Sequence, residues 1–146
     1  MFTIQEGTAH ELREALWLAR RAAHVTVPAE LVLRALEQDR GLFLVARGPD
    51  GPSGALVGMG SGPLEARILL MAVAPEAQRL GIGGQLLRSA ITAWQRQGVR
   101  SLGLEVRADN SDGLRFYQRH GFEIEGFLEG VYEDGADGWA MRKVLS

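Results

Sequence analysis

The segment 66–98 constrains this chain more than any other, because it joins an apolar run to an amphipathic pattern through a glycine-rich turn. The run ARILLMAV (66–73) is apolar enough for a central strand buried on both faces, and Pro75 ends it. Apolar side chains then recur at helical spacing over 83–97, and Gly98 stands where a helix usually ends. We therefore expect a buried strand, a turn and a helix in direct succession.

The rest of the chain alternates between strand-like and helical patterns. The turn residues GPDGPS (48–53) separate two apolar runs and prevent either element from continuing, so these runs predict a β-hairpin. We expect a single α/β (α+β) domain over residues 1–146, with a mixed sheet of six or seven strands and helices on both faces. The expected strands are 2–6, 41–47, 54–60, 66–73, 102–106, 122–128 and 139–145, and the further helices are 10–24, 28–38 and 114–120.

The composition excludes several kinds of chemistry. The chain has 146 residues, of which 16 are basic and 18 acidic, and it contains no cysteine. A thiol nucleophile, a zinc–thiolate site, an iron–sulfur cluster and a disulfide framework are therefore ruled out. The near-balanced charge, without a basic block, argues against a nucleic-acid partner.

The hydropathy pattern bears on location. The longest fully apolar run, 68–74, is far shorter than the about 20 residues that cross a bilayer, so no membrane contact is expected. The first sixteen residues contain three glutamates and lack a basic start followed by an apolar stretch, so no signal peptide is visible. We expect a cytoplasmic protein.

The glycine-rich turn is a candidate anion site. Glycine lets the backbone approach a ligand closely, the first N–H groups of a helix have no partner within it, and the helix dipole favours negative charge there. A phosphate or pyrophosphate fits such a junction; the alternative is that the glycines only make a tight turn. Two nucleotide signatures are missing: no Gly-Lys pair exists for a Walker loop, and Leu86 replaces the third glycine of a Rossmann pattern beginning at Gly81 and Gly83.

Two linked motifs resemble the GCN5-related N-acetyltransferases (GNATs). QRLGIGGQLL (78–87) resembles the family's (Q/R)-x-x-G-x-(G/A) acetyl-CoA loop, LEVRADNSDGLRFYQRHGF (104–122) its second signature, and WAMRKVL (139–145) its closing strand. The resemblance covers the whole chain in order. It implies the GNAT fold, acetyl-CoA as cosubstrate without a metal, and direct acetyl transfer to a primary amine of a small molecule or protein. The alternative is a non-catalytic CoA-binding or protein-interaction module on the same fold; a homodimer is compatible with either.

The resemblance assigns cofactor contacts to particular positions. Backbone groups of Met71 and Val73 would pair with the pantetheine arm, and Asn110 would contact the cofactor, the alternative being a plain helix N-cap. Arg79 and Leu80 replace the family's usual glycine and basic residue, so backbone donors would carry more of the pyrophosphate binding. The turn that would hold the pyrophosphate consists of Gln78, Arg79, Leu80, Gly81, Ile82, Gly83 and Gly84.

Glu105 and Tyr117 are the candidate catalytic residues. A protonated alkyl amine, with a pKa of about 10, cannot attack a thioester, so a base is useful. Some family members carry a catalytic glutamate at the position of Glu105, and Tyr117 would lie near the thioester sulfur and protonate the leaving thiolate. The alternatives are a solvated or cross-strand-paired carboxylate for Glu105 and a core aromatic for Tyr117.

The remaining candidates are weaker. Tyr132, in the acidic loop 129–137, resembles a tyrosine of protein N-terminal acetylating members and would bind the acceptor; the loop's carboxylates could attract a cationic amine or be merely solvated. Gly113 departs from the alanine common at its position. The histidines have no metal spacing, and a calcium loop starting at Asp109 fails because His120 holds its twelfth position. No metal site is expected.

Overall fold

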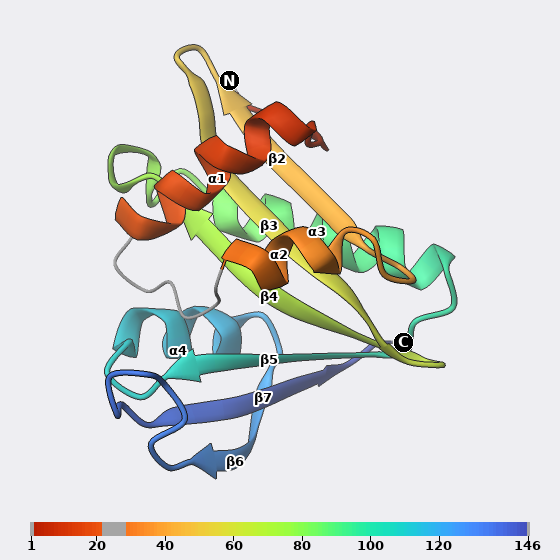
Figure 1. Ribbon diagram of the computed structural model, residues 1–146, viewed down its shortest axis with the longest axis vertical. Helices are drawn as coiled ribbons and strands as arrows, with labels where there is room; N and C mark the ends of the chain where they lie inside the picture. The colour runs from red at the N-terminus through yellow and green to blue at the C-terminus, as the bar shows by residue number, and fades with distance from the viewer. Residues whose placement is uncertain (1, 22–28, 146) are drawn as a thin grey trace.

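The computed structural model describes residues 2–21 and 29–145 (Figure 1). Residues 22–24 of the first predicted helix, and Pro28 of the second, lie outside the described residues. The elements are β1 (Thr3–Glu6), α1 (Ala9–Arg21), α2 (Ala29–Ala35), β2 (Leu42–Gly48), β3 (Gly51–Gly62), β4 (Glu65–Val73), the 3-10 turn η1 (Pro75–Ala77), α3 (Ile82–Arg96), β5 (Ser101–Arg107), α4 (Ser111–Arg119), β6 (Glu123–Leu128) and β7 (Gly138–Val144).

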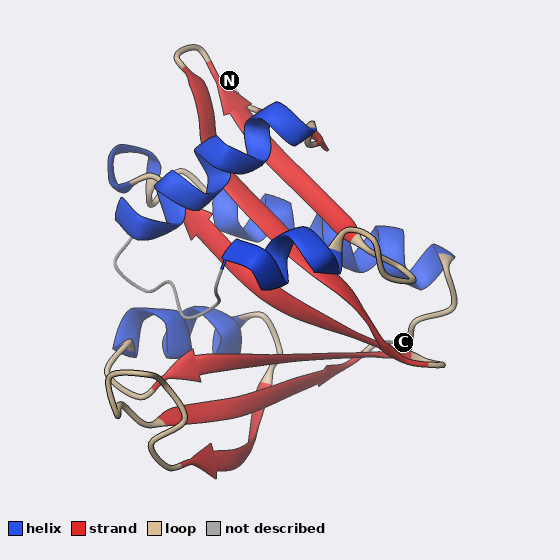
Figure 2. Ribbon diagram, in the orientation of Figure 1, coloured by secondary structure: helices blue, strands red, loops and turns tan. Residues whose placement is uncertain are grey.

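The strands form one mixed sheet in the order β1-β2-β3-β4-β5-β7-β6. All described neighbours are antiparallel except β4 and β5, which run parallel with α3 as their crossover. Helices α1 and α2 pack on one face through one core cluster, whereas α3 and α4 pack on the other face (Figures 1 and 2). The predicted α/β fold, with seven strands and helices on both faces, is confirmed.

Strand β4 contributes buried residues to the cores on both faces of the sheet, but its other residues are only half-buried, and a bulge divides it. The partner of Val57 is Leu70 and that of Gly58 is Ile68, so Leu69 is an extra residue in the ladder. Because an extra residue reverses the alternation of side chains, the two halves of the strand bury different faces. Ala66 and Ile68 belong to the core on the α3 side, and Leu70 and Ala72 to the core on the α1 side.

The expectation that GPDGPS stops both strands of the hairpin is wrong. Strand β3 begins at Gly51, which pairs with Gly48, and Pro52 pairs with Arg47. The positive φ of Gly51, +110°, completes the reversal within a very short turn. A register shift next to Arg47 then accommodates the proline, which has no N–H to give to a ladder.

Helix α3 is fixed to the sheet by Trp94, whose side chain is fully buried. The indole Nε1 donates a hydrogen bond of 3.0 Å to the carbonyl of Arg40. Gly58 leaves room for the ring, because a Cβ there would lie 2.6 Å from it. This contact holds the helix across β3, so that the N-terminus of α3 lies beside the end of β4.

In the described part of the chain, no helix is both long and apolar enough to cross a membrane.

Candidate active site

The site begins where the pairing between β4 and β5 stops. The parallel ladder contains three pairs of residues, and the last of them joins Arg67 to Gly103. Beyond this pair the two strands diverge, as Figure 1 shows, so residues 68–73 and 104–107 have no strand partner across the opening. A molecule that presents amide groups can therefore lie between the strands and pair with their edges.

The edge of β4 presents the backbone groups that the sequence assigns to a ligand. The N–H of Ala74 donates to the carbonyl of Ser53 on β3, at 2.8 Å. Successive residues of a strand direct their N–H and C=O groups to opposite edges, so Val73 and Met71 direct theirs away from β3 and into the opening. The geometry supports the predicted pantetheine contacts of these two residues, which stay a prediction.

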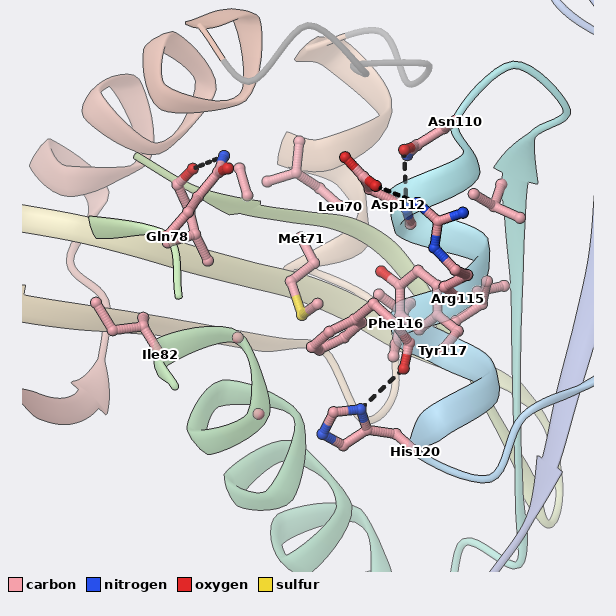
Figure 3. Close-up of a pocket in the computed structure, with 18 of the residues that line it drawn as sticks. Leu70, Met71, Gln78, Ile82, Asn110, Asp112, Arg115, Phe116, Tyr117 and His120 are labelled. Atoms are coloured by element: carbon pink, nitrogen blue, oxygen red, sulfur yellow. Dashed lines mark hydrogen bonds and ion pairs between the residues drawn. The ribbon is translucent and has the colours of Figure 1, made fainter. Parts of the chain in front are cut away.

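A cavity of about 920 Å³ occupies the opening. Figure 3 shows Gln78 and Ile82 on one side, the side chains of α4 on the other, and Met71 between them. Most of the predicted site residues line this cavity: Met71, Val73, Gln78, Arg79, Gly81, Ile82, Gly83, Gly84, Glu105, Asn110 and Tyr117. Leu80 and Tyr132 are not among its lining residues.

The glycine-rich turn opens α3 directly onto the cavity. Gly81 is the N-cap with φ of +80°, and the first hydrogen bond of the helix runs from the N–H of Gln85 to its carbonyl. The N–H groups of Ile82, Gly83 and Gly84 therefore have no partner within the helix. Gln78 holds the turn against β4, because its Nε2 donates to the carbonyl of Val73 at 3.2 Å. The turn has the geometry of an anion site.

Two departures from the family pattern have local explanations. Arg79 adopts a left-handed φ of +71°, which glycine adopts without strain, and this accounts for the glycine usual at its position. Leu80 is 57% exposed and does not line the cavity, so its predicted cofactor contact stays a prediction. Arg79 lines the cavity, so one residue of the turn brings a cation there although Leu80 has none.

Asn110 is the N-cap of α4, as its alternative interpretation predicts. Its Oδ1 accepts a hydrogen bond of 2.9 Å from the N–H of Gly113. The side chain also lines the cavity, so capping and ligand contact remain compatible. A Cβ at Gly113 would clash with the Asn110 amide, which explains why this chain has glycine where alanine is common.

Tyr117 lies between the core and the cavity. Its ring contacts Phe116 and Phe122 edge-on, with centroids 5.2 and 5.5 Å apart, and it packs against the core on the α3 side. The residue lines the cavity, so both interpretations of Tyr117 describe part of its surroundings. Burial raises the pKa of the phenol, so the hydroxyl stays protonated at neutral pH.

Glu105 points to the opposite face of the sheet from Tyr117. Its neighbours Leu104 and Val106 are buried in the core on the α3 side, so alternation directs Glu105 toward the α1 side. Its carboxylate forms an ion pair with Arg67 on the neighbouring strand. The cross-strand pair that the sequence left as an alternative is present, and the side chain remains one-third exposed at the cavity.

Tyr132 lies near Glu105 but outside the cavity. Its ring packs under the guanidinium of Arg107, 5.2 Å from the ring centroid, and its hydroxyl is buried without a hydrogen-bond partner in the described part of the chain. Burial, and next the charge of Glu105, raise the pKa of the Tyr132 phenol. Arg107 also binds Asp134 at 2.7 Å, and these hydrogen bonds lower the pKa of that carboxyl. The acidic loop is thus partly neutralised.

Sequence reasoning missed three residues at the site. The ring of Phe116 lies against the first turn of α3. The His120 ring lies beside it, tilted by 36° with the centroids 4.4 Å apart, and its Nδ1 donates to the Phe116 carbonyl at 2.9 Å (Figure 3). Their spacing of four residues on one helix was the available signal. Arg67, which pairs with Glu105 but does not line the cavity, was the third, and its signal was a single charge in the otherwise apolar run 66–73. Among the described residues, no group of three potential metal ligands occurs.

Comparison with known proteins gives consistent matches. The profile of the acetyltransferase (GNAT) domain matches residues 39–124. Ribosomal protein bS18-alanine N-acetyltransferase of Escherichia coli (strain K12) is 38% identical over 74 residues, 51% of this chain and 49% of that protein. The N-alpha-acetyltransferase of Sulfurisphaera tokodaii is 32% identical over 82 residues, 56% of this chain and 49% of that protein. The chain spans about half the length of these curated relatives.

A solved structure matches over nearly the whole chain. Ard1 from Thermoplasma volcanium superposes with a TM-score of 0.90 at 28% sequence identity, and the match covers 99% of this chain and 98% of that one. The similarity therefore extends beyond the segment that carries the two motifs.

Replacing Gly83 by valine should strongly weaken acetyl-CoA binding without unfolding the protein. A Cβ at Gly83 would lie 3.2 Å from the Phe116 ring, so a branched side chain fills the cavity in front of the free N–H groups. Loss of two hydrogen bonds to a charged ligand corresponds to an affinity decrease of about 100-fold or more, measurable by calorimetric titration. Gly126→Val is the matched control, because a Cβ there meets nothing within 4 Å. Unchanged affinity in Gly83→Val would remove this turn from the binding site.

Proposed function

The chain belongs to the GNAT acetyltransferase family, and we propose that it transfers the acetyl group of acetyl-CoA to a primary amine. The observation that carries this proposal is the opening between β4 and β5. The glycine-rich turn before α3, which has the geometry of an anion site, borders it on one face of the sheet, and the Glu105 carboxylate lies toward the other face. A thioester with a long amide-bearing arm and a pyrophosphate matches these features one by one.

The cosubstrate would lie along the opening. Its amide-bearing arm would pair with the backbone of Met71 and Val73, and its pyrophosphate would accept hydrogen bonds from the first turn of α3. Arginines line the α3 and α4 side of the cavity, among them Arg79, Arg88 and Arg119. Their positive charges favour a ligand with several phosphate groups. This arrangement would leave the thioester near the closed end of the opening, where the pairing of β4 with β5 stops at Arg67 and Gly103.

The transfer itself requires a neutral amine. The amine nitrogen attacks the thioester carbonyl, a C–N bond forms, and the C–S bond breaks with release of a thiolate. The proton lost by the amine would pass to Glu105, directly or through water, because this carboxylate faces the cavity. Tyr117 would donate a hydrogen bond or a proton to the thiolate. Proton transfer from a phenol whose pKa burial has raised is uphill, so solvent completes the protonation if Tyr117 only donates a hydrogen bond.

We propose a polypeptide N-terminus as the acceptor. Two relatives are named for acetylating an alanine or an N-alpha group, which supports an α-amino substrate. The buried and unpartnered Tyr132 hydroxyl, close to Glu105, is a further group that an incoming backbone could pair with.

The cytoplasmic location and the homodimer stay predictions. Light scattering coupled to size-exclusion chromatography measures the oligomeric state.

The activity is tested by the release of free CoA thiol from acetyl-CoA in the presence of peptides with free N-termini. The chain contains no cysteine, so a thiol reagent reports only the released CoA. We expect release that depends on the peptide amine and stops when the N-terminus is blocked. Tight binding of acetyl-CoA without release for any peptide or small amine would favour the non-catalytic module instead.

Replacing Glu105 by glutamine should slow the reaction in a pH-dependent way. An α-amino group has a pKa of about 8, so below this pH the enzyme must remove a proton, and above it the amine is already neutral. We expect kcat/KM to fall by about 10²- to 10⁴-fold near pH 6.5 and by much less above pH 9. Glu125→Gln is the control, because that carboxylate also pairs with an arginine but lies on β6. A loss of equal size at every pH indicates a structural role for Glu105.

Replacing Tyr117 by phenylalanine separates its two interpretations. If the hydroxyl assists departure of the thiolate, kcat should fall by about 10²- to 10⁴-fold while acetyl-CoA affinity stays within a few fold. If Tyr117 is only a core aromatic, phenylalanine fills the same volume and kcat stays near the wild-type value. Steady-state kinetics with the best acceptor decide between these outcomes, and urea unfolding verifies that stability is preserved.

A further inference from the structure

A single charged side chain interrupts the apolar run 66–73 of strand β4, at the end of the opening where β4 and β5 still pair. Arg67 forms the last parallel pair with Gly103, and its guanidinium is ion-paired with Glu105. The Arg67 and Glu105 side chains are 37% and 33% exposed, so solvent reaches both charges. The proposed function uses Glu105 but gives Arg67 no role.

Arg67 is the least occupied of the described arginines on β4, β5 and β7. Arg107 donates four hydrogen bonds to two carboxylates. Arg142 donates two hydrogen bonds to a carboxylate and one to a hydroxyl. Arg67 donates one hydrogen bond, from Nη2 to Glu105, although a guanidinium has five N–H donors. Within the described part of the chain, the other N–H donors of the Arg67 guanidinium therefore have no hydrogen-bond partner.

The neighbouring strand leaves these donors uncovered. The residue beside Arg67 on β5 is Gly103, and a Cβ there would lie 3.8 Å from Nη1 of Arg67. The same Cβ would lie 3.8 Å from Nη2 of Arg142, so a larger side chain at Gly103 would take up space beside both guanidinium groups. Glycine keeps open the space next to the Arg67–Glu105 pair.

The charge of Arg67 restricts the amines that can use Glu105. An ammonium group beside Glu105 also lies close to the guanidinium, and like charges repel. An acceptor that carries its own anion offsets this repulsion, because the anion can accept hydrogen bonds from Arg67 while the amine faces Glu105. Guanidinium groups suit carboxylates in particular, since two parallel N–H donors match two carboxylate oxygens.

We propose that Arg67 is a specificity-determining residue that selects a primary amine with a carboxylate a few bonds away. This inference rests on the proposed acetyl transfer and adds the substrate class. The carboxylate binds the free donors of Arg67, and the amine lies at Glu105 next to the thioester. The proposed polypeptide N-terminus offers this chemistry when aspartate or glutamate follows it, and a free α-amino acid is the alternative source that the test distinguishes.

The test compares matched acceptors at saturating acetyl-CoA. Peptide amides beginning Ala-Asp and Ala-Asn have second residues of nearly the same shape that differ in charge, and Ala-Arg reverses the charge. Alanine with alaninamide forms the free amino-acid pair. One charge-assisted hydrogen-bond pair corresponds to about a tenfold preference or more in kcat/KM for the carboxylate-bearing member. We expect the preference mainly as a lower KM for the acceptor with the carboxylate. It should appear among the peptides if the enzyme acetylates N-termini, and between alanine and alaninamide if it acetylates free amino acids.

Variants assign the preference to Arg67. In Arg67→Gln the ratio of kcat/KM for the acidic over the neutral acceptor should fall to about one, and Arg67→Lys should restore part of it. Arg142→Gln removes a nearby arginine that donates three hydrogen bonds and does not pair with Glu105, so it should keep the wild-type ratio. A wild-type ratio near one, a preference for Ala-Arg, or an unchanged ratio in Arg67→Gln overturns the inference. Acetylation of the neutral acceptors shows in those cases that the proposed function survives, whereas no turnover of any acceptor contradicts both.

Discussion

The site depends on where the parallel pairing between β4 and β5 stops. Hydrogen bonds outside the ladder hold the closed end together: the N–H of Arg100 donates to Leu64 and the N–H of Leu145 donates to Arg100, both at 2.7 Å. Beyond Arg67 and Gly103, each strand keeps one edge without a strand partner. A backbone group that is buried without a partner costs about 1–3 kcal/mol, so these edges require water or a ligand. The protein thus maintains an opening that a strand-like ligand completes.

The fold is predictable from the sequence where the pattern is local. The helical stripe over 83–97 and the apolar run over 66–73 report burial directly, and both elements are found. The error at 48–53 has a non-local cause, because turn-forming residues join a strand when the partner strand absorbs a register shift. The bulge at Leu69 is equally invisible in the sequence, since a register belongs to two strands.

The site, too, is predictable only where its residues are continuous in the sequence. The turn from Gln78 to Gly84 is continuous in the sequence, so a motif identifies it as a unit, and all of it except Leu80 lines the cavity. The pairing of Arg67 with Glu105 joins residues that are 38 positions apart, and only the parallel register brings them together. Sequence reasoning could name an ion pair as one fate of Glu105 but had no means to identify its partner.

An opening that passes through a sheet has two mouths. The first turn of α3 and the ring of Phe116 border one mouth, and the Arg67–Glu105 pair stands at the other, on the face covered by α1 and α2. For the proposed transfer, the two substrates would enter from opposite sides and meet inside the sheet. Neither then blocks the path of the other, so the ternary complex can assemble in either order, and the spent thiol can leave before or after the acetylated product.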